Sequence, residues 1–109
     1  MDVAAINQLA AEQLAKAESA ESGRSSVTVY SRPGARLRQT LMALTAGNVM
    51  GEHKSPGDAS LLCIQGRVRL HAGDTELELA PGDLIAVPPQ RHDVEALEPS
   101  ALLLTVALH

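Results

Sequence analysis

Five side chains could supply acid–base or nucleophilic chemistry at neutral pH: four histidines and one cysteine, at positions 53, 71, 92, 109 and 63. An imidazole titrates near physiological pH, so it can donate a hydrogen bond or transfer a proton. His71 follows the alternating Arg67 and Arg69 and is expected to be exposed, and His109 is terminal. No sequence feature near Cys63 would lower its pKa, so a nucleophilic role is not expected.

The other two histidines lie in segments punctuated by glycine and proline. One segment runs from Gly47 to Gly66 and reads GNVMGEHKSPGDASLLCIQG. The second runs from Pro81 to His92 and reads PGDLIAVPPQRH. Together they resemble the two halves of the cupin motif. In the first half a glycine precedes a His-x-His pair by five residues, a glutamate follows, and a glycine closes the strand. The second half is Gly-Asp, a short apolar strand, a proline and a histidine.

The resemblance covers Val27 to Leu108 and implies a jelly-roll β-barrel with a pocket at one open end. Metal-bearing cupins use two histidines and a carboxylate from the first half and one histidine from the second. By position, His53 matches the first of these ligands and His92 the last, whereas Ser55 and Ala59 replace the other two. Two imidazoles fall short of the three or four protein ligands that a transition metal requires. We therefore expect no tightly bound metal, and the alternative is a weakly bound divalent transition metal on His53 and His92.

Six residues are expected around the pocket: the two motif histidines, and four residues on or beside strands that would line the barrel. They are His53, His92, Met42, Met50, Cys63 and Gln65. The methionines and the cysteine would either shape an apolar pocket or be plain core. The glutamine would either point inward or face water. The two histidines would act as hydrogen-bond donors or a proton-transfer pair in a metal-free pocket. The alternative is that one is a surface-loop histidine and the other an inert remnant of a metal site.

Residues 2 to about 18 have the apolar spacing and alanine content of a helix, which Asp2 can cap. Residues 19–26 are small and polar and read as a linker. We therefore divide the chain into a helix and linker, 1–26, and a barrel domain, 27–109. The helix would pack over an open end of the barrel or dock on a partner subunit.

From Val27 the sequence alternates between polar and apolar residues, with Gly and Pro turns between short segments. Each such segment reads as a strand: 27–30, 36–44, 61–65, 67–70, 76–79, 84–87, 94–97 and 102–107. Many short strands at regular spacing are typical of an antiparallel barrel or sandwich. The predicted class is all-β, a jelly-roll barrel with a short N-terminal helix.

Composition and charge limit the kinds of partner that the chain could bind. The net charge is −4 without a basic run, and Tyr30 is the one aromatic residue, which argues against nucleic acid. A single cysteine fits a reducing cytoplasm, and no signal peptide is evident. The longest apolar run, Ala101 to Leu104, is too short to span a bilayer. Open sheet edges and abundant aliphatic residues suggest a homodimer.

These observations favour a small cytoplasmic cupin that binds a small molecule in its barrel without catalysis. One alternative is a minimal metal-dependent enzyme, an oxygenase or isomerase, that uses His53 and His92. Another is a structural dimerisation module, because one fold of this kind hosts many unrelated functions.

Overall fold

The computed structural model describes residues 2–53 and 58–108, with residues 52 and 53 described by their backbone alone. Within these ranges one helix is followed by nine strands. Their bounds are α1 (Ile6–Ser19), β1 (Arg24–Tyr30), β2 (Leu37–Leu44), β3 (Val49–His53), β4 (Asp58–Gln65), β5 (Val68–Ala72), β6 (Thr75–Leu79), β7 (Leu84–Ala86), β8 (His92–Ala96) and β9 (Ser100–Ala107).

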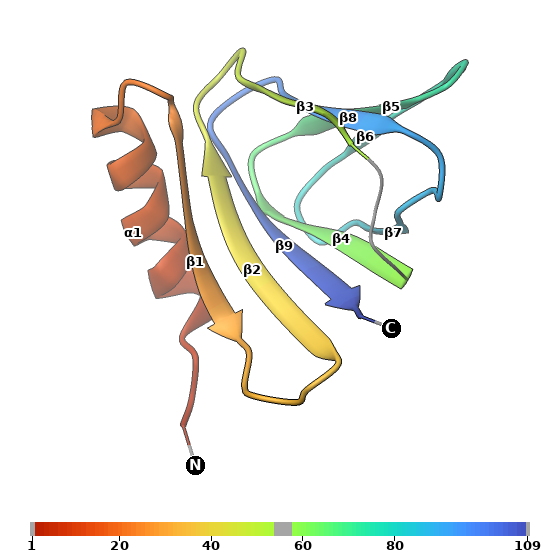
Figure 1. Ribbon diagram of the computed structural model, residues 1–109. Coiled ribbons are helices and arrows are strands. Elements are labelled where there is room, and N and C mark those ends of the chain that lie inside the picture. The colour runs from red at the N-terminus through yellow and green to blue at the C-terminus, as the bar shows by residue number, and fades with distance from the viewer. Residues whose placement is uncertain (1, 54–57, 109) are drawn as a thin grey trace.

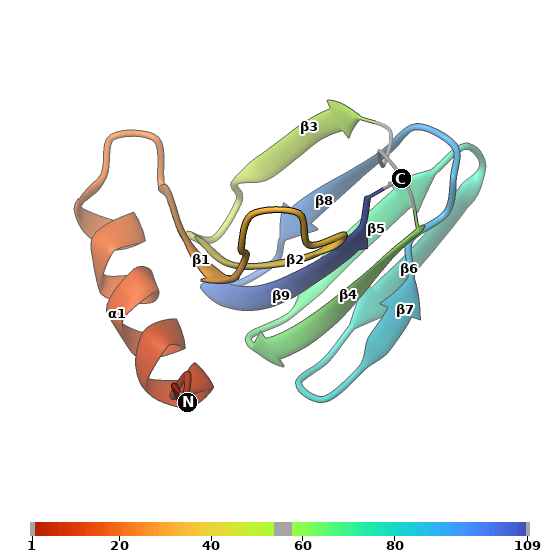
Figure 2. The same ribbon diagram turned by 60° about the horizontal axis from the view of Figure 1, so that its bottom comes forward.

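The strands form two antiparallel sheets that lie face to face (Figures 1 and 2). The five-stranded sheet has the order β1-β2-β9-β4-β7, and the four-stranded sheet has the order β3-β8-β5-β6. β9 pairs along its length with both β2 and β4. The all-β prediction is confirmed.

The core lies between the sheets and follows from the alternation of the sequence. In β5, Val68, Leu70 and Ala72 are buried, while the residues between them are half-buried on the outer face. Successive residues of a strand point to opposite faces, so every second residue contributes to the core. Leu44 and Leu102 meet this layer from the opposing sheet.

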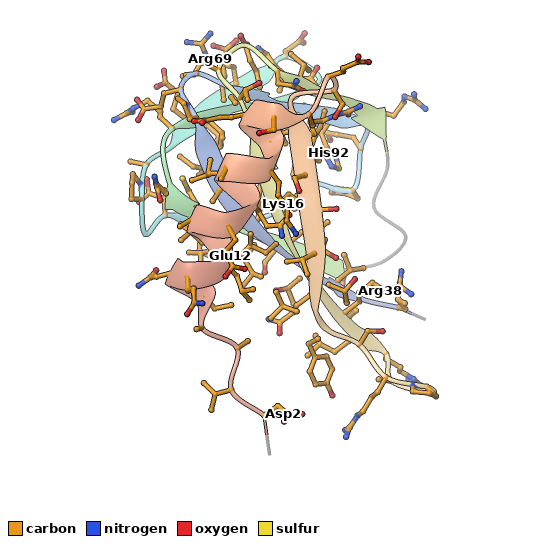
Figure 3. The ribbon with its side chains drawn as sticks, turned by 90° about the vertical axis from the view of Figure 1, so that its left-hand side faces the viewer. Asp2, Glu12, Lys16, Arg38, Arg69 and His92 are labelled. Atoms are coloured by element: carbon orange, nitrogen blue, oxygen red, sulfur yellow. The ribbon has the colours of Figure 1, made fainter. Side chains whose placement is uncertain are left out.

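The helix packs on the outer face of the five-stranded sheet (Figure 1). Ala10 is buried in one cluster with Leu41 and Ala101. Figure 3 shows Glu12 and Lys16 on the side of the helix turned away from the sheet. The helix thus covers a sheet face of its own chain, and not an open end of the barrel. The helix begins at Ile6, and its N-cap residue is Ala5, which makes no side-chain capping hydrogen bond. The capping role predicted for Asp2 is therefore wrong.

β1 begins at Arg24, three residues before the first expected strand. The local sequence is polar, but Arg24 pairs with Leu44 and Ser25 with Ala43 across the sheet. A neighbouring strand can impose extended structure on residues whose own composition reads as a linker. β4 is also longer than expected and starts at Asp58.

Gly66 is required where β4 turns into β5. Its φ is +87°, and an added Cβ would lie 2.3 Å from the carbonyl oxygen of Pro99. Only glycine fits such a conformation and approach. The buried hydroxyl of Ser100 accepts a hydrogen bond from the Arg67 amide at 3.1 Å and donates one to the Glu98 carbonyl at 2.7 Å. The turn expected at Gly66 is therefore fixed by both backbone conformation and packing.

Candidate functional site

His92 opens β8 and lies among the buried residues. Its backbone pairs with Ala72 of β5 on one side and with His53 of β3 on the other. Only 3% of the residue is exposed, and its Nδ1 lies 3.0 Å from the Gln90 carbonyl oxygen. A carbonyl oxygen accepts only, so this contact favours the tautomer that carries a proton on Nδ1.

A small cavity adjoins the His92 ring between the two sheets. We call it the His92 cavity; it is lined by Met42, Met50, Leu61, Leu70, Val87, His92, Val94 and Leu104. Among the described residues that line it, the imidazole is the one polar side chain. The volume is about 20 Å³, and a water molecule needs roughly 10–15 Å³ of such space. The cavity as it stands holds about one water.

A larger hollow, here called the β1–β3 groove, opens beside it. It is lined by Arg24, Ser25, Ser26, Met42, Ala43, Leu44, Met50 and Gly51, and its volume is about 410 Å³. Met42 and Met50 line both hollows. Two flexible thioether side chains therefore separate the open groove from the buried imidazole.

The structure places the expected pocket residues in different surroundings. Met42, Met50 and His92 come together around the His92 cavity. Cys63 is fully buried in the core, where burial and then the carboxylate of Asp83 raise the pKa of its thiol. Such a thiol is a poor nucleophile at neutral pH.

Gln65 is exposed and does not line the His92 cavity. The register between β4 and β9 shifts between Cys63 and Gln65. A bulge of this kind breaks the alternation on which an inward position at residue 65 depended. The side chain of His53 and the whole of Ser55 lie outside the described residues.

The described residues supply only part of the ligand set of a metal-bearing cupin. Ala59 occupies the position of the family's glutamate, two residues before Leu61 on the same face of β4. Its methyl group offers no ligand atom. Among the described residues no three His, Cys, Asp or Glu side chains are grouped as a metal site.

A second polar cluster, absent from the sequence-based expectations, covers the outer face of the four-stranded sheet. We call it the outer ladder; its members are Arg67 just before β5, Arg69 and His71 of β5, Glu76 and Glu78 of β6, and Asp93 of β8. The His71 ring lies between two carboxylates, with Nδ1 2.9 Å from Asp93 Oδ1 and Nε2 2.8 Å from Glu76 Oε2. The hydrogen bond to Asp93, more than the charge of Glu76, raises the pKa of His71.

The arginines complete the outer ladder. Arg67 Nη1 lies 3.2 Å from Glu78 Oε1, and Arg69 Nη2 lies 3.6 Å from Glu78 Oε2. Arg69 Nε is 3.2 Å from Glu76 Oε1 but is not aligned for a hydrogen bond. Cross-strand neighbours of opposite charge explain why the half-buried outer face of this sheet is polar.

Comparison with known proteins identifies the family. Residues 40–107 match the family model of the cupin domain. The chain therefore belongs to the cupin family, and its two antiparallel sheets form the expected jelly-roll barrel. No curated protein sequence matches the chain.

Solved structures share this fold. A cupin superfamily protein from Desulfitobacterium hafniense is 21% identical, with a TM-score of 0.73 over 79% of this chain and 78% of that one. A conserved protein of unknown function from Streptococcus pyogenes is 27% identical, with a TM-score of 0.72 over 83% and 78%. The DMSP lyase DddQ from Ruegeria pomeroyi is 18% identical, with a TM-score of 0.68 over 77% of this chain and 46% of that one. The similar structures thus include an enzyme and proteins without an assigned activity.

No helix among residues 2–53 and 58–108 is long and apolar enough to cross a membrane.

Proposed function

We propose that this cupin binds a small molecule in the β1–β3 groove and does not transform it. The observation that carries the proposal is that the groove and the His92 cavity share Met42 and Met50. A ligand seated in the groove would contact the two methionines directly. If they change rotamer, the ligand reaches the imidazole of His92.

The size and lining of the groove support this proposal. Ligand sites typically enclose roughly 300–1,000 Å³, with an apolar lining and a few polar groups. The groove has about 410 Å³, an apolar wall of Met42, Leu44 and Met50, and polar side chains on β1. Methionine adapts its shape at low cost, which suits a site that must open.

Binding without chemistry is supported by three residues of the barrel, Ala59, Cys63 and His92. Ala59 stands where the family's carboxylate ligand would be. The raised pKa of the Cys63 thiol leaves it protonated at neutral pH. In the tautomer that the Gln90 contact favours, Nε2 of His92 can accept a hydrogen bond from a ligand, and the described residues that line the His92 cavity include no Ser, Thr or Cys for it to activate.

The test is a panel of small acids, alcohols and amines, screened by NMR of the labelled methionine methyl groups. We expect binders to shift the methyl signals of Met42 and Met50 together. The variant Ser26→Trp, at an exposed position on the groove wall, should abolish these shifts. Thr28→Trp is the matched control, because Thr28 is exposed two residues along the same face of β1 and does not line the groove. A panel that moves neither methyl would refute the proposal.

A minimal metal-dependent enzyme is the second candidate, and the backbone register favours it. His53 and His92 are direct cross-strand partners, so both motif halves meet at this pair. The proposal predicts a transition metal ion in protein purified without an affinity tag, lost in His92→Ala. Elemental analysis that finds only traces in the wild type would exclude it.

We also propose that the chain forms a homodimer in the cytoplasm. β1 is an edge of the five-stranded sheet, and an open edge of seven residues can pair with a second copy. The free thiol of Cys63 suits a reducing compartment. Sedimentation at micromolar concentration should give twice the chain mass, and the mass of one chain would contradict the dimer.

A further inference from the structure

We infer that the ligand class of the β1–β3 groove is a carboxylic acid with an unbranched aliphatic chain. The carboxylate would lie at Arg24 and Ser26, and the chain would lie on Met42, Leu44 and Met50. This inference rests on the proposed function, because it names the chemistry of a ligand for the same groove.

Arg24 lies on the inner face of its sheet. It is directly opposite Leu44 of β2, and Leu44 is buried in the core between the sheets. Directly opposed residues of an antiparallel pair share a face, so the arginine is on the groove side. Among the described residues that line the groove, Arg24 carries the one charge.

Ser25 and Ser26, which follow Arg24, lie on opposite faces of β1. The hydroxyl of Ser25 donates a hydrogen bond to Gln13 of the helix, on the outer face. Ser26 is directly opposite Met42, which lines the groove and packs against the core, so Ser26 shares its face with Arg24. An arginine and a hydroxyl two residues apart on one face form a donor pair, and a carboxylate accepts from both.

The remaining wall is aliphatic and adaptable. Met42, Leu44 and Met50 present no hydrogen-bond donor or strong acceptor. The sequence holds no Phe or Trp and only one Tyr, so aromatic stacking is not available as a main source of affinity. An unbranched chain fits between two methionines better than a rigid ring does, because thioether side chains fill irregular gaps.

The polarity of the groove sets the orientation of the ligand. Arg24 and Ser26 are exposed, whereas Met42 and Met50 border the buried His92 cavity. The carboxylate would therefore stay at the solvent side, and the chain would point inward. The protein carries a net charge of −4, so overall electrostatics oppose an anion. Any preference for acids thus depends on Arg24 itself.

The experiment compares three probes of equal length, namely hexanoate, 1-hexanol and hexylammonium. Dissociation constants are read from the methyl signals of Met42 and Met50. Because Arg24 is exposed, its ion pair is worth little, and we expect hexanoate to bind only about fivefold more tightly than hexanol. Hexylammonium should bind most weakly.

Arg24→Gln should remove the difference between hexanoate and hexanol and leave hexanol binding unchanged. Arg38→Gln is the control, since Arg38 is an exposed arginine on β2 that does not line the groove (Figure 3). Equal binding of all three probes by the wild type, or tightest binding of the amine, would overturn the acid class and leave the groove proposal intact. Failure of every probe to shift either methyl would overturn both.

Discussion

His71 and His92 lie on neighbouring strands of one sheet, but His71 is on its partly exposed outer face and His92 is buried on its inner face. His92 is buried beside a cavity whose other walls are aliphatic, and its Nδ1 meets a backbone carbonyl. His71 is on the outer face, with a carboxylate on each ring nitrogen. The register brings the two regions together, because His71 pairs with Asp93 and Ala72 pairs with His92.

The two faces of this sheet are therefore stabilised by different interactions. The inner face contributes stability through apolar packing, which is sensitive to shape and insensitive to pH. The outer face is held by ion pairs between half-exposed side chains, which contribute little each and respond to pH and salt. Changes to the inner face should therefore cost stability, and changes to the outer face should alter its dependence on conditions.

The largest effect is expected at the inner face. Leu70→Ala removes a side chain that is 2% exposed and should lower the free energy of unfolding by about 2–5 kcal/mol. Leu84→Ala is the control, since Leu84 is 65% exposed and should change it by no more than about 0.5 kcal/mol. Urea denaturation measures both. Equal losses would show that the inner packing is not what stabilises the sheet.

The two histidines themselves give the direct comparison. His92→Ala deletes a buried ring and its contact with the Gln90 carbonyl, and should cost about 1–3 kcal/mol in urea denaturation at neutral pH. His71→Ala should cost clearly less, because its ring is partly exposed. The reverse order would contradict the contrast between the faces.

The next prediction concerns pH. The pKa of His71 is raised in the folded protein, chiefly by the hydrogen bond to Asp93 and also by Glu76. Arg69 and Glu78 of the same outer ladder form an ion pair with each other. The proton therefore stabilises the fold fully below the unfolded pKa of about 6.5. This stabilisation is lost as the pH rises through the folded pKa. Unfolding curves should show it, and His71→Gln should flatten that part of the pH profile.

The two carboxylates should contribute unequally. Asp93→Asn removes the largest cause of the raised pKa of His71, so it should lower that pKa more than Glu76→Gln does. Titration of the His71 ring protons by NMR separates the two variants. A larger shift in Glu76→Gln would place the main interaction on the β6 side of the ring.

The smallest effect is expected at the exposed end of the outer ladder. The Arg67 and Glu78 side chains are 48% and 41% exposed, and such pairs contribute at most about 1 kcal/mol. Arg67→Ala should change the free energy of unfolding within this limit, and added salt should shrink the difference further. A larger, salt-independent loss would mean that the arginine stem packs on the sheet.

The fold could be predicted because turn glycines and alternating strands are local features of the sequence. Arg24 and Ser26 were missed because their segment is polar and reads as a linker, and only pairing with β2 makes it a strand. The ion pairs of His71 depend on the register of β5 with two other strands, which no local pattern fixes. Gln65 lies beyond a bulge, and the position of a bulge is likewise set by the partner strand.

The place of β9 in the five-stranded sheet has a consequence for synthesis of the chain. β2 and β4 hydrogen-bond to β9 and not to each other. The central strand of the sheet is therefore missing until residues 100–107 have been synthesised and have left the ribosome. While these residues are inside the ribosome, the nascent chain can form the β5–β6 hairpin but cannot join β1-β2 to β4-β7. Aliphatic surface of β2 and β4 then stays open to chaperones or to other nascent chains. That exposure ends when residues 100–107 have left the ribosome and paired with β2 and β4.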